Sequence, residues 1–246
     1  MTHRDHPARA GSLRALIQGK PALRQFYAAV YAWFAARVAA CPPGGTVLEL
    51  GSGAGFLKEI LPDAVTSDLI PYDGVDRVVD AAHLPFPDAS LRAILMMNVF
   101  HHLPDAERFL REAQRCLIPG GRVVIFDQHP GWISRPILRW GHHEPYHPRA
   151  AEWAFPSTGP LSGANGALAW IVFRRDRHRL AIVIPGLALD VWRPVFPLTY
   201  WLAGGLKRWS LLPGRAFGAA AALDHWLARL APPLASFVEI ELVRRT

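Results

Sequence analysis

The sequence predicts an α/β protein built on a doubly wound, mostly parallel sheet. Three observations lead to this prediction. From residue 46 onward, short apolar runs alternate with helical patterns, as in chains whose parallel strands are joined by crossover helices. A glycine-rich turn lies within VLELGSGAG at 47–55, directly after the first of these runs. Acidic or amide side chains end several of the later runs, at the edge where such sheets bind ligands.

The elements before the sheet are a tail and one helix. We expect residues 1–19 to form a mobile tail, because they are polar and charged and show no long apolar period. Pro21 occupies a first helical position, and apolar residues follow at helical spacing as far as Val38. CPPGG at 41–45 ends this helix.

Five strands and their connections follow. We expect a short helix at 56–61 and a longer one at 105–117, whose apolar side chains share one face and which PGG then ends. The predicted strands are 46–50, 64–69, 76–81, 91–99 and 122–127.

After residue 130 the pattern loosens. We expect a loop or broken helix at 132–148, a helix within 164–184, and strands at 187–194 and 236–245. The predicted division of the chain is therefore an N-terminal tail and helix at 1–45, a ligand-binding core at 46–130, and acceptor-side loops, an apolar helical insertion and closing edge strands at 131–246.

Composition and charge narrow the class of protein. The chain has 246 residues, of which 51% are apolar and 19% charged, so it can bury a sizeable core. Residues 46–130 carry 7 Lys and Arg against 12 Asp and Glu, a net −5, and the remainder carries 20 against 8, a net +12. Basic flanks suit an anionic substrate, a membrane surface or nucleic acid, and equally an ordinary solvated surface.

The cysteines and the start of the chain suggest a location. Cys41 and Cys116 do not make a disulfide framework, which favours a reducing compartment. The polar first residues do not resemble a signal peptide, and no run reaches the roughly 18 apolar residues of a membrane span. We therefore expect a cytoplasmic protein.

The glycine turn discriminates between two cofactor classes. A dinucleotide site needs G-x-G-x-x-G, and the position of its third glycine is Phe56. Glu49 precedes the first glycine by two residues. A carboxylate there would repel a diphosphate and attract a ligand that carries an ammonium and a sulfonium.

These motifs together resemble the class I S-adenosylmethionine-dependent methyltransferases, most closely the bacterial type 11 group. The resemblance rests on VLELGSGAG, SDL, VDAAHLPFPDAS, ILMMNVFHHLPD and FLREAQRCLIPGGRVVIFD, which occur in the family's order over about residues 46–127. It implies a Rossmann-like methyltransferase fold and S-adenosylmethionine as cofactor.

The resemblance also implies cofactor contacts. The glycine turn would pass under the methionine moiety, the acid at the end of the second strand would accept the ribose hydroxyls, and the next turn would read the adenine edge. Asn98 would lie near the transferring methyl. The implied cofactor-binding residues are Glu49, Gly51, Ser52, Gly53, Gly55, Asp68, Leu69, Asp80, Ala81 and Asn98.

One departure from the family pattern affects the adenine side. Only 12 positions separate Asp68 from Asp80, so the usual helix between the second and third strands does not fit. We expect Tyr72 or the N-terminal helix to cover the adenosine instead. Each carboxylate also has a purely structural interpretation as a cap of a loop or helix.

Candidates for the catalytic base come from the segments after the fourth and fifth strands. A hydroxyl acceptor often needs a base near the methyl. The candidates are His101, His102, Asp127, His129, His142, His143, Glu144 and His147, and from them we select His101, His102 and His143. Asp127 could instead anchor its loop, and HHEPYHP at 142–148 could bind a metal. Its two prolines break regular ligand geometry, so we expect no metal site.

The sequence thus predicts a methyltransferase that acts on a small-molecule, glycan or lipid-like acceptor, with oxygen slightly favoured. A non-catalytic S-adenosylmethionine-binding partner subunit and a nicotinamide-dependent oxidoreductase are the alternatives. No nucleic-acid partner is expected. The apolar, Trp-rich and basic lobe at 186–235 forms a lid in one interpretation and touches a membrane surface in the other. The sequence makes no prediction about the oligomeric state.

Overall fold

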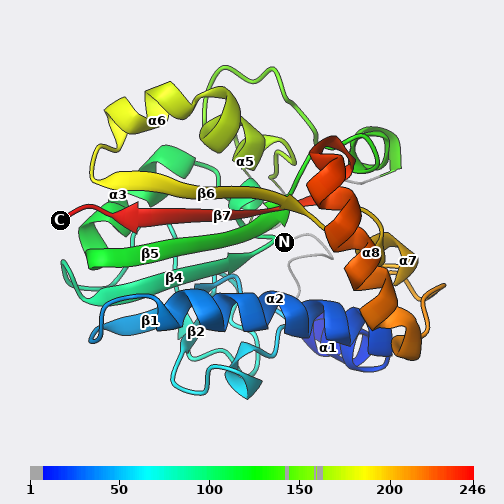
Figure 1. Ribbon diagram of the computed structural model, residues 1–246. Helices are drawn as coiled ribbons and strands as arrows, with labels where there is room; N and C mark the ends of the chain where they lie inside the picture. The colour runs from blue at the N-terminus through cyan, green and yellow to red at the C-terminus, as the bar shows by residue number, and fades with distance from the viewer. Residues whose placement is uncertain (1–7, 142–143, 158, 160–162) are drawn as a thin grey trace.

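A computed structural model describes residues 8–141, 144–157, 159 and 163–246. Its centre is a seven-stranded sheet in the order β3-β2-β1-β4-β5-β7-β6 (Figure 1). The first five strands in the chain pair in parallel, and the last two pair antiparallel at one edge. The strands are β1 Thr46–Leu50, β2 Val65–Asp68, β3 Arg77–Val78, β4 Leu91–Met97, β5 Leu117–Gln128, β6 Leu187–Val195 and β7 Phe237–Arg244. The predicted fold class is confirmed.

Helices cover both faces of this sheet. The α-helices are α1 Ala8–Gln18, α2 Pro21–Ala39, α3 Ala106–Cys116, α4 Ser134–Pro136, α5 Leu168–Trp170, α6 Arg177–Val183, α7 Thr199–Leu202 and α8 Phe217–Leu230. Single 3₁₀ turns occupy Leu57–Glu59, Phe100–His102, Gly214–Ala216 and Pro232–Leu234, and π-helical turns occupy Ile137–Gly141 and Ile171–Arg175.

The core divides into two layers because side chains alternate along the strands. In β4, Ile94 and Met96 join the layer that contains α3, whereas Ala93 and Leu95 join the layer that contains α2. The two helices therefore cover opposite faces of the sheet, and α8 lies on the α2 side. A strand buried on both faces reads as a continuous apolar run, as the fourth predicted strand does.

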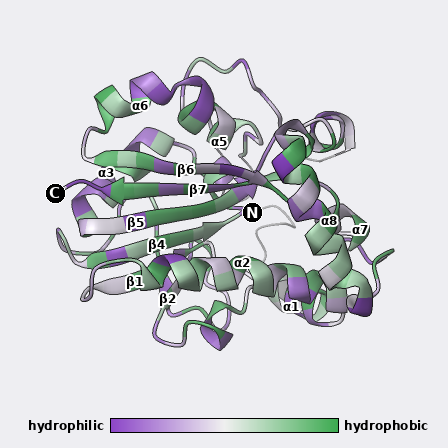
Figure 2. Cartoon of the chain, viewed as in Figure 1, coloured by the Kyte–Doolittle hydropathy of each residue, from purple (hydrophilic) through white to green (hydrophobic). Residues whose placement is uncertain are grey.

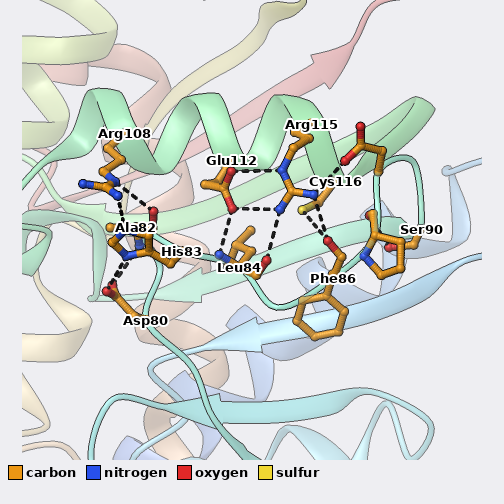
Figure 3. Close-up of polar contacts among 12 residues, drawn as sticks. Asp80, Ala82, His83, Leu84, Phe86, Ser90, Arg108, Glu112, Arg115 and Cys116 are labelled. Atoms are coloured by element: carbon orange, nitrogen blue, oxygen red, sulfur yellow. Dashed lines mark hydrogen bonds and ion pairs between the residues drawn. The ribbon is translucent and has the colours of Figure 1, made fainter.

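Helix α3 follows its sequence pattern closely. Its N-cap is Asp105, whose side chain accepts a hydrogen bond of 2.9 Å from the backbone N–H of Arg108. Near the other end, the Arg115 guanidinium donates to the carbonyl oxygens of Leu84 and Phe86 at 3.0 and 2.9 Å (Figure 3). This helix thereby holds the segment that connects β3 to β4.

Three predicted elements differ from the structure. Residues 8–18 form α1 rather than a tail, because Ala10 packs with Ile70 and Tyr72 in a small cluster of its own. The PGG after α3 does not separate helix from strand: β5 begins at Leu117 and runs through it, with a register shift against β4. The helix expected within 164–184 is broken into α5, a π-helical turn and α6.

Two further expectations concern cysteines and membrane spans. Cys41 and Cys116 are free and buried. Within the described part of the chain, no helix is both long and apolar enough to span a bilayer.

Candidate functional site

The glycine turn leaves no room for side chains. Gly51 has a φ of 69°, a left-handed conformation that favours glycine, and a Cβ there would overlap the Val99 side chain. A Cβ on Gly55 would overlap the Tyr31 hydroxyl of α2. The turn is thus enclosed by β4's C-terminal end and by α2, which explains why glycines recur in it.

Two serines fix the turn against the end of β2. The backbone N–H of Ser52 donates to the Ser67 carbonyl at 2.8 Å, and the Ser67 N–H donates to the Ser52 hydroxyl at 3.1 Å. The Ser67 hydroxyl donates to the carbonyl of Glu49 at 2.7 Å. The carboxyl ends of β1 and β2 are therefore held together independently of any ligand.

Glu49 is buried at this edge with one oxygen unused. Glu49 is only 2% exposed, and its Oε2 has no hydrogen-bond partner among the described residues. Burial raises the pKa of the carboxyl to about 7; the Ser52 hydrogen bond opposes this rise and the nearby Asp68 adds to it. A buried carboxylate in this state favours a cationic ligand.

Asn98 presents a second unused oxygen. It follows β4 with a φ of 55°, and its backbone N–H donates to the Phe126 carbonyl at 2.7 Å. Its Oδ1 is buried and unpartnered within the described residues. An unsatisfied buried oxygen costs free energy unless a ligand supplies a donor. Glu49 and Asn98 therefore fit a ligand that donates hydrogen bonds, as an ammonium does.

Asp68 stands at the end of β2, beside the turn. Its Oδ2 accepts from the Gly53 N–H at 3.0 Å and its Oδ1 accepts from the Ile70 N–H at 3.1 Å. Burial raises its pKa, and these backbone hydrogen bonds oppose the rise. Each carboxylate oxygen has a further lone pair, so the group can still accept ribose hydroxyls. Leu69 follows it with an exposed side chain.

Asp80 is engaged elsewhere. Its Oδ1 accepts from the Ala82 N–H at 2.9 Å, and its Oδ2 pairs with the His83 ring at 3.0 Å, while Arg108 reaches the far side of that ring (Figure 3). An adenine amine would have to share or displace these partners. Ala81 packs partly buried against the core. The adenine contacts of this turn stay a prediction.

Helix α1 takes the place beside the shortened β2–β3 connection. The Arg14 guanidinium donates to the carbonyl of Gly55 at 2.7 Å, and Ala10 packs against Tyr72. The sequence did not predict this helix. It and Tyr72 lie beside the short β2–β3 connection, where the family's usual helix does not fit.

A chain of charged groups lies past β4 and β5. The His101 Nδ1 is 2.5 Å from the Asp127 Oδ1, and its Nε2 is 3.2 Å from the Glu144 Oε2. The His102 Nε2 is 3.4 Å from the other Glu144 oxygen. Gln128 donates to Glu144 at 3.2 Å. The structure thus brings His101 and His102 together on one carboxylate, and His143 lies outside the described residues.

The carboxylates of Asp127 and Glu144 make His101 a cation. Burial acts to lower its pKa, but the charges and hydrogen bonds of Asp127 and Glu144 outweigh burial and raise it to about 10. In the same way, burial acts to raise the pKa of Glu144, and both histidines hold it well below its usual range. His101 carries its proton between two carboxylates at neutral pH.

The same three side chains could in principle hold a metal ion. Ligand atoms of His101, His102 and Glu144 lie within 4.8 Å of one another. In the described structure the Nε2 atoms of His101 and His102 each face an oxygen of Glu144, so the three side chains also pair directly with one another. Glu144 was among the candidate bases that the sequence offered but was not one of the three selected, and Gln128 was not a candidate. Gln128 is the last residue of β5, and this position is the only signal it gives.

Residues 48–125 match a family model described as a methyltransferase domain. The match spans the glycine turn, Asp68, Asp80 and the end of β4.

Residues 48–125 form a class I S-adenosylmethionine-dependent methyltransferase domain. S-adenosylmethionine is the methyl donor of this family, and the unused oxygens of Glu49 and Asn98 with the free lone pairs of Asp68 fit it. The match argues against the nicotinamide-dependent alternative.

The chain is similar to curated proteins whose names differ in what they act on. It is 26% identical over 190 residues to the 2-methyl-6-phytyl-1,4-hydroquinone methyltransferase of Synechocystis sp., covering 68% of this chain and 59% of that protein. It is 30% identical over 128 residues to the 2-phytyl-1,4-naphtoquinone methyltransferase of Synechococcus elongatus, covering 43% and 54%. The chain thus spans little more than half the length of these relatives.

Solved structures support the fold. A chain of the complex between the Haloferax volcanii Trm112 methyltransferase activator and a methyltransferase superposes with a TM-score of 0.57. The two share 16% identity, and the superposition covers 100% of this chain and 99% of the other. At this identity the likeness concerns the fold alone.

Proposed function

We propose that the chain transfers a methyl group from S-adenosylmethionine to an oxygen of a small, lipid-like acceptor such as a prenylated hydroquinone. One observation carries the proposal: the cofactor-side oxygens at the ends of β1, β2 and β4 and the Asp127–His101–Glu144 chain share one edge of the sheet. The phytyl groups in the names of two relatives support a lipid-like acceptor.

The cofactor, when bound, supplies a methyl group on a positively charged sulfur that is already an excellent leaving group. The work left to the protein is therefore alignment of the acceptor and control of charge. Glu49 and Asn98 would orient the methionine end, and Asp68 the sugar. The backbone of the glycine turn can approach the ligand closely because no side chain intervenes.

The proton of the acceptor needs a destination. In O-methylation, the acceptor oxygen forms the bond to carbon, the carbon–sulfur bond breaks, and the hydroxyl proton must leave. His101 already carries a proton, so it is not the primary base in this state. Because both histidines hold the pKa of the Glu144 carboxyl well below its usual range, this carboxylate alone is a weak base. We assign the role to Glu144 and His102 together, whose Oε1 and Nε2 lie 3.4 Å apart. Asp127 holds His101 in place.

The side chains near Glu144 suit an aromatic acceptor. Tyr200 is partly buried, and burial together with the Glu144 charge raises its pKa to about 12. Tyr200 also packs edge-on against Phe237 with ring centroids 5.0 Å apart. Aromatic side chains beside a carboxylate provide both a flat apolar contact and a proton acceptor.

The test is methyl transfer from S-adenosylmethionine to a panel of hydroquinones with and without a prenyl tail, followed by product mass. We expect a Glu144→Gln variant to lower kcat by about 100-fold or more while the cofactor Kd stays unchanged. Glu152→Gln is the matched control, because this carboxylate is 72% exposed and pairs only with Arg179 in the described structure.

Two outcomes would contradict the proposal. Full activity in Glu144→Gln would remove the assigned base. Tight cofactor binding with no turnover on any acceptor would favour the alternative of a non-catalytic S-adenosylmethionine-binding partner subunit.

A further inference from the structure

One exposed face of α8 carries a row of large apolar side chains. Along α8, Leu223, Trp226 and Leu230 recur at intervals of three and four residues, and all three are exposed. This spacing places them in one stripe on the helix surface. The opposite face is buried through Phe217 and Ala228. The stripe therefore points away from the protein core.

The same end of the molecule carries further exposed apolar side chains. The backbone N–H of Trp132, which is 70% exposed, donates at 2.6 Å to the carbonyl of Pro233, just beyond α8. Trp140 is 77% exposed in the turn that follows α4. In Figure 1, α4's segment, α7 and α8 all lie at the end toward which the parallel strands point.

The loop after α7 extends this surface. Leu211 donates from its backbone to the Leu202 carbonyl at 2.8 Å, which folds the loop back onto α7. Trp209 and Leu211 are 51% and 73% exposed. Figure 2 shows hydrophobic green along much of α8, interrupted by hydrophilic purple. We call the exposed apolar side chains Trp132, Trp140, Trp209, Leu223, Trp226 and Leu230 the apolar rim.

The charges around the apolar rim have one sign. Segments 130–141 and 196–235 contain a single acidic residue, Asp224. Asp224 is 1% exposed, and its carboxylate accepts from the backbone N–H groups of Leu198 and Thr199. The exposed charged side chains of both segments are all basic: Arg135, Arg139, Lys207, Arg208, Arg215 and Arg229.

We propose that the apolar rim and its basic side chains dock the protein onto an anionic lipid bilayer surface. Exposed Trp and Leu beside arginines is the composition of an interfacial membrane contact, and the basic charge is complementary to anionic headgroups. A scattered set of exposed apolar residues would need no explanation, but here they coincide with a surface free of exposed acidic groups.

The position of the apolar rim explains what docking would do for the reaction. This step rests on the proposed function. Gln128, which contacts Glu144, is followed within a few residues by Trp132. The rim thus borders the same edge of the sheet as the acceptor side. A lipid-like acceptor could pass from the bilayer to Glu144 without crossing water.

The experiment is co-sedimentation of the whole chain with vesicles of phosphatidylglycerol and phosphatidylcholine, compared with phosphatidylcholine alone. We expect binding to the anionic vesicles that weakens as salt is raised. The double variant Trp226→Ser, Leu230→Ser should bind at least tenfold more weakly, and Arg229→Gln about fivefold. Ile182→Ser on α6 is the matched control, since Ile182 is 65% exposed and lies away from the rim.

The variants also separate this inference from the proposed function. They should keep the cofactor affinity and the turnover of a soluble hydroquinone, and lose turnover only of a prenylated acceptor held in vesicles. Absence of salt-sensitive binding to anionic vesicles overturns the inference, even where methyl transfer is intact. So does a dimer that Trp226→Ser, Leu230→Ser dissociates, because the rim would then be covered by a second copy.

Discussion

Replacing Glu49 by Gln should make the protein more stable and a poorer binder of S-adenosylmethionine. The carboxyl has a pKa of about 7 in the folded chain, against an ordinary value of 4.5. Below pH 4.5 the group is protonated in both states. Between pH 4.5 and about 7 the unfolded chain releases the proton of Glu49 and the folded chain keeps it, so the free energy of unfolding falls as the pH rises.

The size of this loss follows from the two pKa values. At about 1.4 kcal/mol per pKa unit, ionisation of Glu49 lowers the free energy of unfolding by about 3 kcal/mol at pH 8 and by about 1 kcal/mol at pH 5. Gln keeps the shape of the side chain without the charge. The variant should therefore melt about 6 to 12 °C higher than the parent at pH 8, with a much smaller difference at pH 5.

Cofactor affinity should change in the opposite direction. Loss of a hydrogen bond to a charged group costs about 1.5 to 3 kcal/mol, which is about 10- to 100-fold in Kd. Thermal unfolding at both pH values and calorimetric titration at pH 8 measure the two effects. Equal melting temperatures at pH 8 together with an unchanged Kd would refute the idea that Glu49 is a buried charge kept for a cationic ligand.

Two further predictions concern the turn and the charged chain. Gly51→Ala should raise the cofactor Kd at least tenfold, because a side chain there meets Val99 at a φ of 69°; Gly218→Ala, where a Cβ meets nothing within 4 Å, is its control, and equal Kd values would argue against a closed turn. Asp127→Asn should lower the pKa of His101, which is raised in the parent to about 10. The stability that this raised pKa contributes is full below pH 6.5 and is lost as the pH rises through about 10. The variant should therefore lose about 3 kcal/mol or more of its free energy of unfolding at pH 6 and very little at pH 11. Urea unfolding at the two pH values measures it, and a loss that is the same at both would mean that Asp127 is not paired with a protonated imidazole.

The sheet could be predicted from the sequence because each of its strands carries its own local signal. The fourth predicted strand is apolar without a break from Ala93 to Met97 because both faces of β4 are covered. The glycine turn gave its ligand class because Glu49 and the absence of a third glycine at Phe56 are both local features. Helix α3, eleven residues long, was predictable because its apolar side chains share one face.

What the sequence could not provide depends on contacts between distant segments. Helix α1 has a weak apolar period, and it folds because Ala10 meets Ile70 and Tyr72. The protonation state of His101 depends on Glu144, which lies more than forty residues away in the sequence. From the sequence His101 was therefore selected as a base, whereas the structure holds it as a cation. The carboxylate of Asp80 turned out to be occupied by His83, which no spacing rule indicates.

The central claim is that the edge formed by Glu49, Asn98 and Asp68 binds S-adenosylmethionine. Isothermal titration of the purified chain with this cofactor and with S-adenosylhomocysteine tests it most directly. The account predicts one site per chain for both ligands, weakened when Asp68 is replaced by Asn. Absence of binding heat for either ligand across a range of temperatures, with the protein shown to be folded, would contradict it.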